Sequence, residues 1–101
     1  VNSCLVALGQ CEGREVTTVE GLGDAQHLTP LQEAMVTEGG AQCGICTPGM
    51  LLSAEALLRE KTVPTDAEIR EAIAGNVCRC TGYQRIVNAV VEAGRRREVR
   101  P

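Results

Sequence analysis

The sequence predicts an all-α protein, a four-helix bundle with pseudo-twofold symmetry, preceded by a short β segment. Three observations favour this fold. Helix-start signals recur from residue 29 onward, apolar residues follow them at helical spacing, and the order of these parts occurs twice. Apolar residues make up 44% of the chain but Tyr83 is the only aromatic one, so the core has to be aliphatic. Such a core suits helices that pack closely through small side chains.

Residues 1–22 are predicted to form strands instead. The stretches SCLVAL and EVTTVEGL are rich in Val and Thr with partial alternation, and a turn through Gly9 to Gly13 separates them. Because two strands alone are marginally stable in water, this hairpin calls for a sheet elsewhere. We therefore assign residues 1–24 to the end of another domain plus a linker, and residues 25–101 to the helical domain. The first residue is Val1 rather than Met, which predicts a natural N-terminus further upstream.

Each predicted helix has a start signal and a stop signal. The starts are at threonines, three of which open a capping box worth about 1 kcal/mol, while the fourth precedes a Pro at the first helical position. The capping boxes open at Thr29, Thr65 and Thr81, and the threonine before Pro is Thr47. The predicted ends are Gly39-Gly40, Val63-Pro64, Gly75-Asn76 and the C-terminal arginines.

The apolar residues of the predicted helices fall on single faces. The last helix shows this most clearly, with an apolar stripe at Tyr83, Ile86, Val87, Val90 and Val91. The order helix, glycine stop, cysteine pair, threonine and helix occurs first from Pro30 to Lys61 and again from Asp66 to about Arg97. Two such units that pack about a pseudo-twofold axis would bring their cysteine loops together at one end.

Four of the six cysteines stand in two close pairs, each before a predicted helix. Cys43 and Cys46 precede Thr-Pro, and Cys78 and Cys80 precede Thr-Gly. A helix N-terminus carries about half a positive charge and free N–H groups, so thiolates and anionic metal-thiolate centres are stabilised there. The sequence therefore predicts a four-thiolate metal site.

Spacing alone leaves the metal open. Structural zinc prefers two C-x2-4-C pairs, whereas the second pair here is the tighter C-x-C. A 2Fe-2S cluster has two irons that each take two thiolates, which suits a site built from two pairs. Spacing favours iron and sulfur over a zinc-stabilised, non-redox interaction module, and a disulfide scaffold is the third alternative.

Charge and hydropathy exclude other classes of function. The net charge of −3 argues against general affinity for nucleic acid, which needs a basic surface. The basic cluster Arg95-Arg96-Arg97 with Arg100 is interpreted as a solvated helix end. No apolar run approaches the roughly 18 residues that would cross a bilayer.

The motifs resemble a known family. The stretches QCGICTPGMLLSAEALL and EIREAIAGNVCRCTGYQRIVNAV, within about Leu28 to Val91, closely resemble the C-terminal 2Fe-2S domain of the iron-sulfur (small) subunit in the xanthine oxidase family of molybdenum hydroxylases. The upstream VNSCLVAL and REVTTVEGL look like the tail of the plant-type ferredoxin domain, a β-grasp fold, that precedes it in that family. The β segment would then be a remnant of that domain.

The resemblance implies roles for particular residues. The ligands of the 2Fe-2S cluster nearest the molybdenum cofactor would be Cys43, Cys46, Cys78 and Cys80. Gln42 and Cys80 would also contact the pterin. Cys4 matches the last ligand of a second, plant-type 2Fe-2S cluster whose other three ligands are absent from this chain. Cys11 has no counterpart in the family. For Arg79 two interpretations are equally favoured: it tunes the cluster, or it is a plain surface residue.

The resemblance also implies partners and a place in a reaction. Electrons would leave a molybdopterin site on a large subunit, pass through this cluster and a second 2Fe-2S cluster, and reach FAD on another subunit. No residue of this chain would transform the substrate, and the substrate cannot be read from the sequence. We expect a cytoplasmic electron-transfer subunit of a multi-subunit oxidoreductase.

Overall fold

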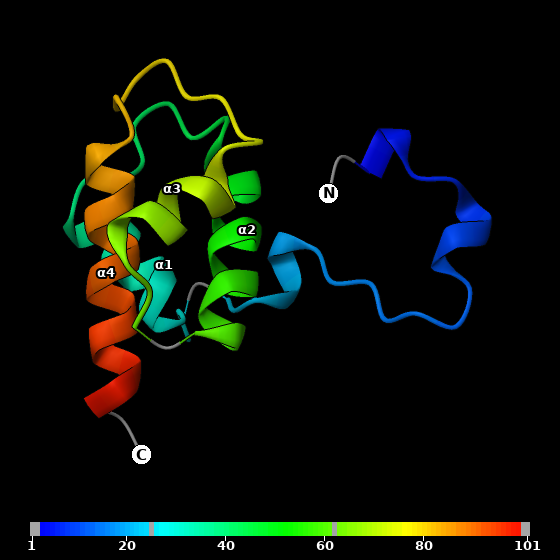
Figure 1. The fold of residues 1–101 in the computed structure, drawn as a ribbon, viewed down its shortest axis with the longest axis horizontal. Coiled ribbons are helices and arrows are strands. Elements are labelled where there is room, and N and C mark those ends of the chain that lie inside the picture. Colours follow the sequence, from blue (N-terminus) through cyan, green and yellow to red (C-terminus); the bar gives the residue numbers. More distant parts are fainter. Residues whose placement is uncertain (1–2, 25, 62, 100–101) are drawn as a thin grey trace.

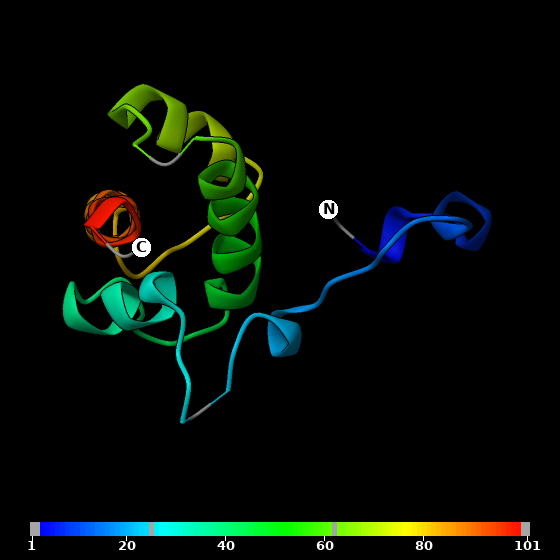
Figure 2. The same cartoon turned by 90° about the horizontal axis from the view of Figure 1, so that it is seen from below.

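Four α-helices pack around one core in the computed structural model, which describes residues 3–24, 26–61 and 63–99. The helices are α1 (Pro30–Thr37), α2 (Thr47–Glu60), α3 (Asp66–Ile73) and α4 (Gln84–Val99). Seen along its axis in Figure 2, α4 has the other three helices around it. Val1 and Arg100, which figured in the sequence predictions, lie outside the described residues. None of the described helices is both long enough and apolar enough to span a membrane.

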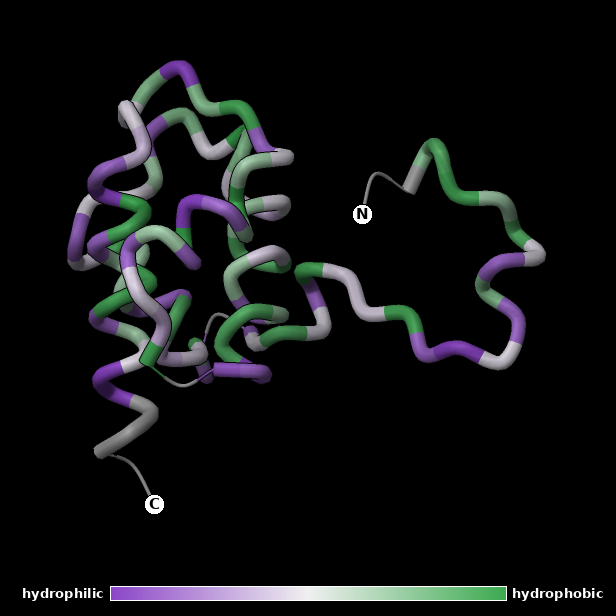
Figure 3. The backbone as a smooth tube through the Cα atoms, viewed as in Figure 1, coloured by the Kyte–Doolittle hydropathy of each residue, from purple (hydrophilic) through white to green (hydrophobic). Residues whose placement is uncertain are grey.

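The core is aliphatic, as the composition requires. Side chains from all four helices are buried in it, and the largest fully buried ones are Leu31, Met50, Ile69, Ile86, Val87 and Val90. Small residues on α4, Ala89 and Ala93, are also fully buried, which lets neighbouring helices approach closely. Figure 3 shows the hydrophobic residues of α4 recurring at helical intervals along the tube.

The helices pack in two main pairs. α1 packs chiefly against α4, and α2 packs chiefly against α3. An axis that exchanged α1 with α3 and α2 with α4 would interconvert these two pairings. The pseudo-twofold arrangement itself stays a prediction.

Two of the three predicted capping boxes form. The Thr29 hydroxyl accepts the Gln32 N–H at 3.2 Å, and the Gln32 side-chain oxygen accepts the Thr29 N–H at 2.9 Å. Thr65 and Glu68 repeat both bonds at the start of α3. Each box satisfies two N–H groups that the first helical turn leaves without partners.

The third predicted capping box, at Thr81, is wrong. α4 begins three residues later, at Gln84, because Gly82 and Tyr83 both adopt positive φ, 68° and 73°, which a helix start cannot include. At the start of α2 the N-cap is Cys46 rather than Thr47, and it makes no side-chain cap bond. Both departures fall in the cysteine loops.

The predicted β remnant is also wrong. Residues 3–24 contain no strand in the part of the chain that the structure describes, but three short 3-10 helices, η1 (Ser3–Leu5), η2 (Leu8–Cys11) and η3 (Val19–Gly21). A strand needs a hydrogen-bonding neighbour, and these residues extend away from the helices as a separate arm (Figure 1). Near the bundle, Val19 and Leu22 pack against the core.

The apolar stripe of α4 is rotated relative to the prediction. Ile86, Val87 and Val90 are buried as expected, but Val91 is 49% exposed. The buried face turns instead toward Ala89 and Ala93, whose small side chains carried little weight in the pattern. At the end of α4, Arg95 is exposed and pairs with Glu92 at 2.6 Å.

Candidate metal centre

Two loops carry the four paired cysteines. The first runs from the end of α1 to Cys46 at the N-cap of α2, and the second joins α3 to α4. Both loops lie at the same end of the bundle, at the top of Figure 1. The prediction that helix packing would bring the two cysteine loops to one end of the bundle is confirmed.

The thiols pair between the loops rather than within them. Cys46 and Cys78 lie close enough for each side chain to affect the pKa of the other, and the same is true of Cys43 and Cys80. Cys78 is buried and Cys46 half-buried, whereas Cys43 and Cys80 are exposed. We call these the inner pair and the outer pair.

Each pair combines an easily ionised thiol with a reluctant one. In the inner pair, the Thr81 hydroxyl and two backbone N–H groups lower the pKa of Cys78 to about 7, while burial and the Cys78 thiol raise the pKa of Cys46 to about 11. In the outer pair, the Ile45 N–H lowers the pKa of Cys43, and the Cys43 thiol raises that of Cys80. In each pair, therefore, one thiol has a lowered pKa and its partner a raised one.

Backbone N–H groups of both loops point at sulfur. Ile45 donates to Cys43, and Thr81 and Cys80 donate to Cys78. Gly44 has a φ of 85°, the left-handed conformation that lets the chain turn tightly between the two cysteines of the first loop. Successive N–H groups aimed at one place form a site suited to negative charge. A cluster bound through four thiolates carries such charge, so the donor set fits it.

The second loop is held by side chains that follow the cysteines. The Thr81 hydroxyl lies 3.1 Å from the Cys78 sulfur and accepts the Tyr83 N–H at 3.1 Å. The Tyr83 hydroxyl accepts the Cys78 N–H at 2.9 Å. The sequence pattern predicted a helix cap at Thr81 and gave no sign of either hydroxyl contact with Cys78.

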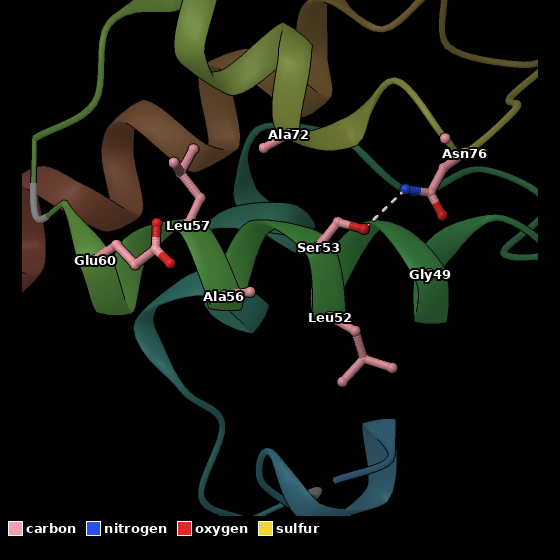
Figure 4. Close-up of a pocket in the computed structure, with 9 residues that line it drawn as sticks. Gly49, Leu52, Ser53, Ala56, Leu57, Glu60, Ala72 and Asn76 are labelled. Atoms are coloured by element: carbon pink, nitrogen blue, oxygen red, sulfur yellow. Dashed lines mark hydrogen bonds between the residues drawn. The ribbon is translucent and has the colours of Figure 1, made fainter. Parts of the chain in front are cut away.

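Asn76 ties the start of the second loop to α2. Its amide nitrogen donates to the Ser53 hydroxyl at 2.9 Å, the bond drawn in Figure 4. The two residues line a groove of about 520 Å³ between α2 and α3, together with Gly49 and Gly75. A side chain at Gly49 would collide with the Asn76 amide, so the absence of one lets Asn76 reach Ser53.

The remaining candidate residues fall into two groups: some lie directly beside the four paired cysteines, and the others lie away from them. Gln42 and Arg79 are exposed next to the cysteines. Cys4 and Cys11 lie in the N-terminal arm, away from the bundle (Figure 1), and His27 is exposed beside Asp24. All six cysteines, each within the described residues, are free thiols. Within those residues no three His, Cys, Asp or Glu side chains are arranged around one point as ligands of a single metal ion would be.

Fold and site define a class: a small helical protein whose four paired thiols lie in two neighbouring loops, each of which leads into a helix. Family comparison agrees, since residues 18–91 match the model of the 2Fe-2S binding domain. The chain belongs to that family.

Individual relatives are a hydroxylase small subunit, a xanthine dehydrogenase and an aldehyde oxidoreductase. The chain is 52% identical to the nicotine 6-hydroxylase small subunit of Paenarthrobacter nicotinovorans, over 92% of its own length and 56% of that protein. It is 50% identical to xanthine dehydrogenase 1 of Arabidopsis thaliana, over 88% of its length and 7% of that enzyme. The crystal structure of the aldehyde oxidoreductase of Desulfovibrio desulfuricans superposes with a TM-score of 0.93 at 40% identity, over 98% of this chain and 11% of that one. The chain thus spans about half of the small-subunit relative and a small part of the larger enzymes.

Proposed function

We propose that this chain is the electron-transfer module of a molybdenum hydroxylase, with Cys43, Cys46, Cys78 and Cys80 as ligands of one 2Fe-2S cluster. The observation that carries the proposal is the pairing of thiols across the two loops. Two irons that each take two thiolates match two thiol pairs. When bound, the cluster supplies a one-electron redox couple.

The two thiol pairs lie at different depths in the bundle, and we assign them different roles. The inner pair anchors the cluster to the core, since Cys78 belongs to the buried cluster of side chains and Cys46 packs against it. The outer pair opens to the surface, where Cys80 and the adjacent Gln42 are exposed. These two residues are the ones we assign to contact with a pterin on a partner subunit.

The surface around the outer pair suits a docking partner. Ile45, between two ligands, is 87% exposed, and Val77, next to a third, is 77% exposed. Two large apolar side chains on the same loops as the thiols favour burial against another protein. We propose a large molybdopterin-binding subunit as that protein, which would also shield the cluster from water.

The N-terminal arm has a separate role in the proposal. We assign residues 1–24 to the end of a plant-type ferredoxin-like domain with its linker, with Cys4 a ligand of its 2Fe-2S cluster, and residues 25–101 to the helical domain. Leu5, Leu8 and Val16 of the arm are exposed here, which supports a contact with further protein. A partner subunit with FAD would accept the electrons. We place the protein in the cytoplasm, whose reducing conditions keep such thiols free.

Absorption and EPR spectroscopy of the purified protein test the assignment. We expect visible absorption, two irons and two sulfides per helical domain, and a rhombic EPR signal after reduction with dithionite. A colourless, EPR-silent protein with one zinc per chain would show the zinc-stabilised interaction module instead.

Cysteine variants test the ligand set. Cys46→Ser and Cys78→Ser should each lose this cluster and melt at lower temperature, because binding of a metal centre contributes directly to folding. Cys11→Ser is the matched control, since its thiol lies in the arm, and it should keep both the cluster and the melting temperature. Unchanged iron content in Cys78→Ser would refute the ligand assignment.

A further inference from the structure

We propose that Thr81 and Tyr83 are positioning residues for Cys78, through which the protein raises the reduction potential of the cluster. This inference rests on the proposed function, because it needs Cys78 to be an iron ligand. The Thr81 hydroxyl donates a hydrogen bond to the ligand sulfur, and Tyr83 holds the loop in the conformation that brings the hydroxyl there.

The hydrogen bond has one possible direction once iron is bound. The Thr81 oxygen lies 3.1 Å from the Cys78 sulfur. A thiolate sulfur has no proton to give, so the hydroxyl is the donor. The same oxygen accepts the Tyr83 N–H at 3.1 Å, which polarises the O–H group and strengthens its donation to sulfur. Cys78 is buried, which limits competition from water for the sulfur.

The backbone just after Thr81 is strained, so surrounding contacts have to hold it in place. Tyr83 has a φ of 73°, the one non-glycine residue with positive φ among those that the structure describes. Strain of this kind persists only where surrounding contacts over-determine it, and it gathers at functional sites. Here the Tyr83 hydroxyl accepts the Cys78 N–H at 2.9 Å, and the ring packs against the core. Tyr83 thus closes a ring of contacts from Cys78 through Thr81 and back.

The first loop offers no such device. Thr47 follows Cys46 as Thr81 follows Cys80, but its hydroxyl oxygen is buried without a hydrogen-bond partner in the part of the chain that the structure describes. Of these two threonine hydroxyls, the one that contacts a cysteine sulfur is therefore that of Thr81, at Cys78. Reduction adds one negative charge to the cluster, and a donor hydrogen bond to a ligand sulfur stabilises the more negative state.

Redox titration of variants in the full protein, purified with the subunits that accompany it, tests the inference. The EPR signal that disappears in Cys78→Ser identifies the cluster concerned. Thr81→Val keeps the side-chain shape and removes the hydroxyl, and we expect the ratio of reduced to oxidised cluster at a fixed potential to fall about tenfold. For a one-electron couple that change corresponds to a midpoint about 59 mV lower. Thr81→Ser should restore the wild-type midpoint, and Thr47→Val, the matched control, should leave it unchanged.

Tyr83→Phe separates positioning from donation. It keeps the ring and the Thr81 hydroxyl but removes the acceptor of the Cys78 N–H, so we expect iron to be lost to a chelator severalfold faster while helical circular dichroism stays unchanged. If Thr81→Val does not assemble a cluster, Thr81→Ala replaces it, with the same lower midpoint expected.

The outcomes separate the two proposals. A wild-type protein without a 2Fe-2S signal would overturn both the function and this inference. A normal wild-type signal with an unchanged midpoint in Thr81→Val or its Ala replacement would overturn the inference alone. The same conclusion follows if Thr81→Ser behaves like Thr81→Val, because the hydroxyl would then have no effect of its own.

Discussion

Two adjacent valines on α4 test the packing that holds the cysteine loops in place. Val90 is 1% exposed and Val91 is 49% exposed, although both belonged to the apolar stripe predicted from the sequence. Truncation of each to Ala removes the same atoms from the same helix. The structure predicts very different costs for the two changes.

The costs follow from burial. Val90→Ala removes two buried carbons, worth about 0.8 kcal/mol each. A residual void of roughly 40 Å³ adds about 1 kcal/mol at ~24 cal/mol per Å³. Ala is the better helix former and regains about 0.5 kcal/mol, so the total is about 2 kcal/mol. Val91→Ala loses about half of the transfer term, roughly 0.8 kcal/mol, and regains about 0.5 kcal/mol because Ala is the better helix former.

Thermal unfolding followed by circular dichroism measures the difference. For a domain of this size 1 kcal/mol shifts the melting temperature by about 4–8 °C, so Val90→Ala should melt roughly 8–16 °C lower and Val91→Ala about 1–2 °C lower. The comparison should be made at equal cluster occupancy, because the cluster itself stabilises the fold. Equal losses in the two variants would refute the rotation of α4 described here.

Three further predictions concern caps, close approach and pH. Thr65→Ala should cost about 1 kcal/mol in denaturant unfolding, because Glu68 loses the acceptor of its N–H, whereas Thr65→Ser should cost little. Gly49→Ala should lower the melting temperature, because a Cβ displaces the Asn76 amide from Ser53, while Gly75→Ala, where no atom lies near the new Cβ, should not; equal effects would contradict this role of Gly49. Arg95 and then Arg96 hold the pKa of Glu92 below its ordinary value of 4.5, so this carboxylate stabilises the fold above that pH and the contribution disappears as the pH falls through the lowered pKa. Glu92→Gln should therefore flatten the acid side of the stability curve measured by urea unfolding, and an unchanged curve would argue against these ion pairs in solution.

Local signals in the sequence were sufficient where the structure depends on local contacts. The capping boxes at Thr29 and Thr65 are complete within four residues, so their pattern predicted both helix starts correctly. The β remnant failed for the opposite reason. A strand is stable only beside a partner, and the apolar alternation of residues 1–22 contains no information about whether that partner is present. Thr81 failed because the same capping pattern also fits a loop in which the hydroxyl turns to a cysteine sulfur.

The arrangement of the thiols depends on tertiary structure in a way that spacing cannot show. In each loop one cysteine lies deeper than the other: Cys78 is buried while Cys80 is exposed, and Cys46 is half-buried while Cys43 is exposed. When two such loops face each other, each thiol meets the one at its own depth, and the contacting pairs are therefore not the pairs seen in the sequence. The spacing predicted four ligands and a preference for two metal atoms, but depth decides which thiols lie together. Because both thiols of the outer pair are exposed and the inner pair lies deeper, depth also gives the proposed cluster one side toward a partner and one side toward the core.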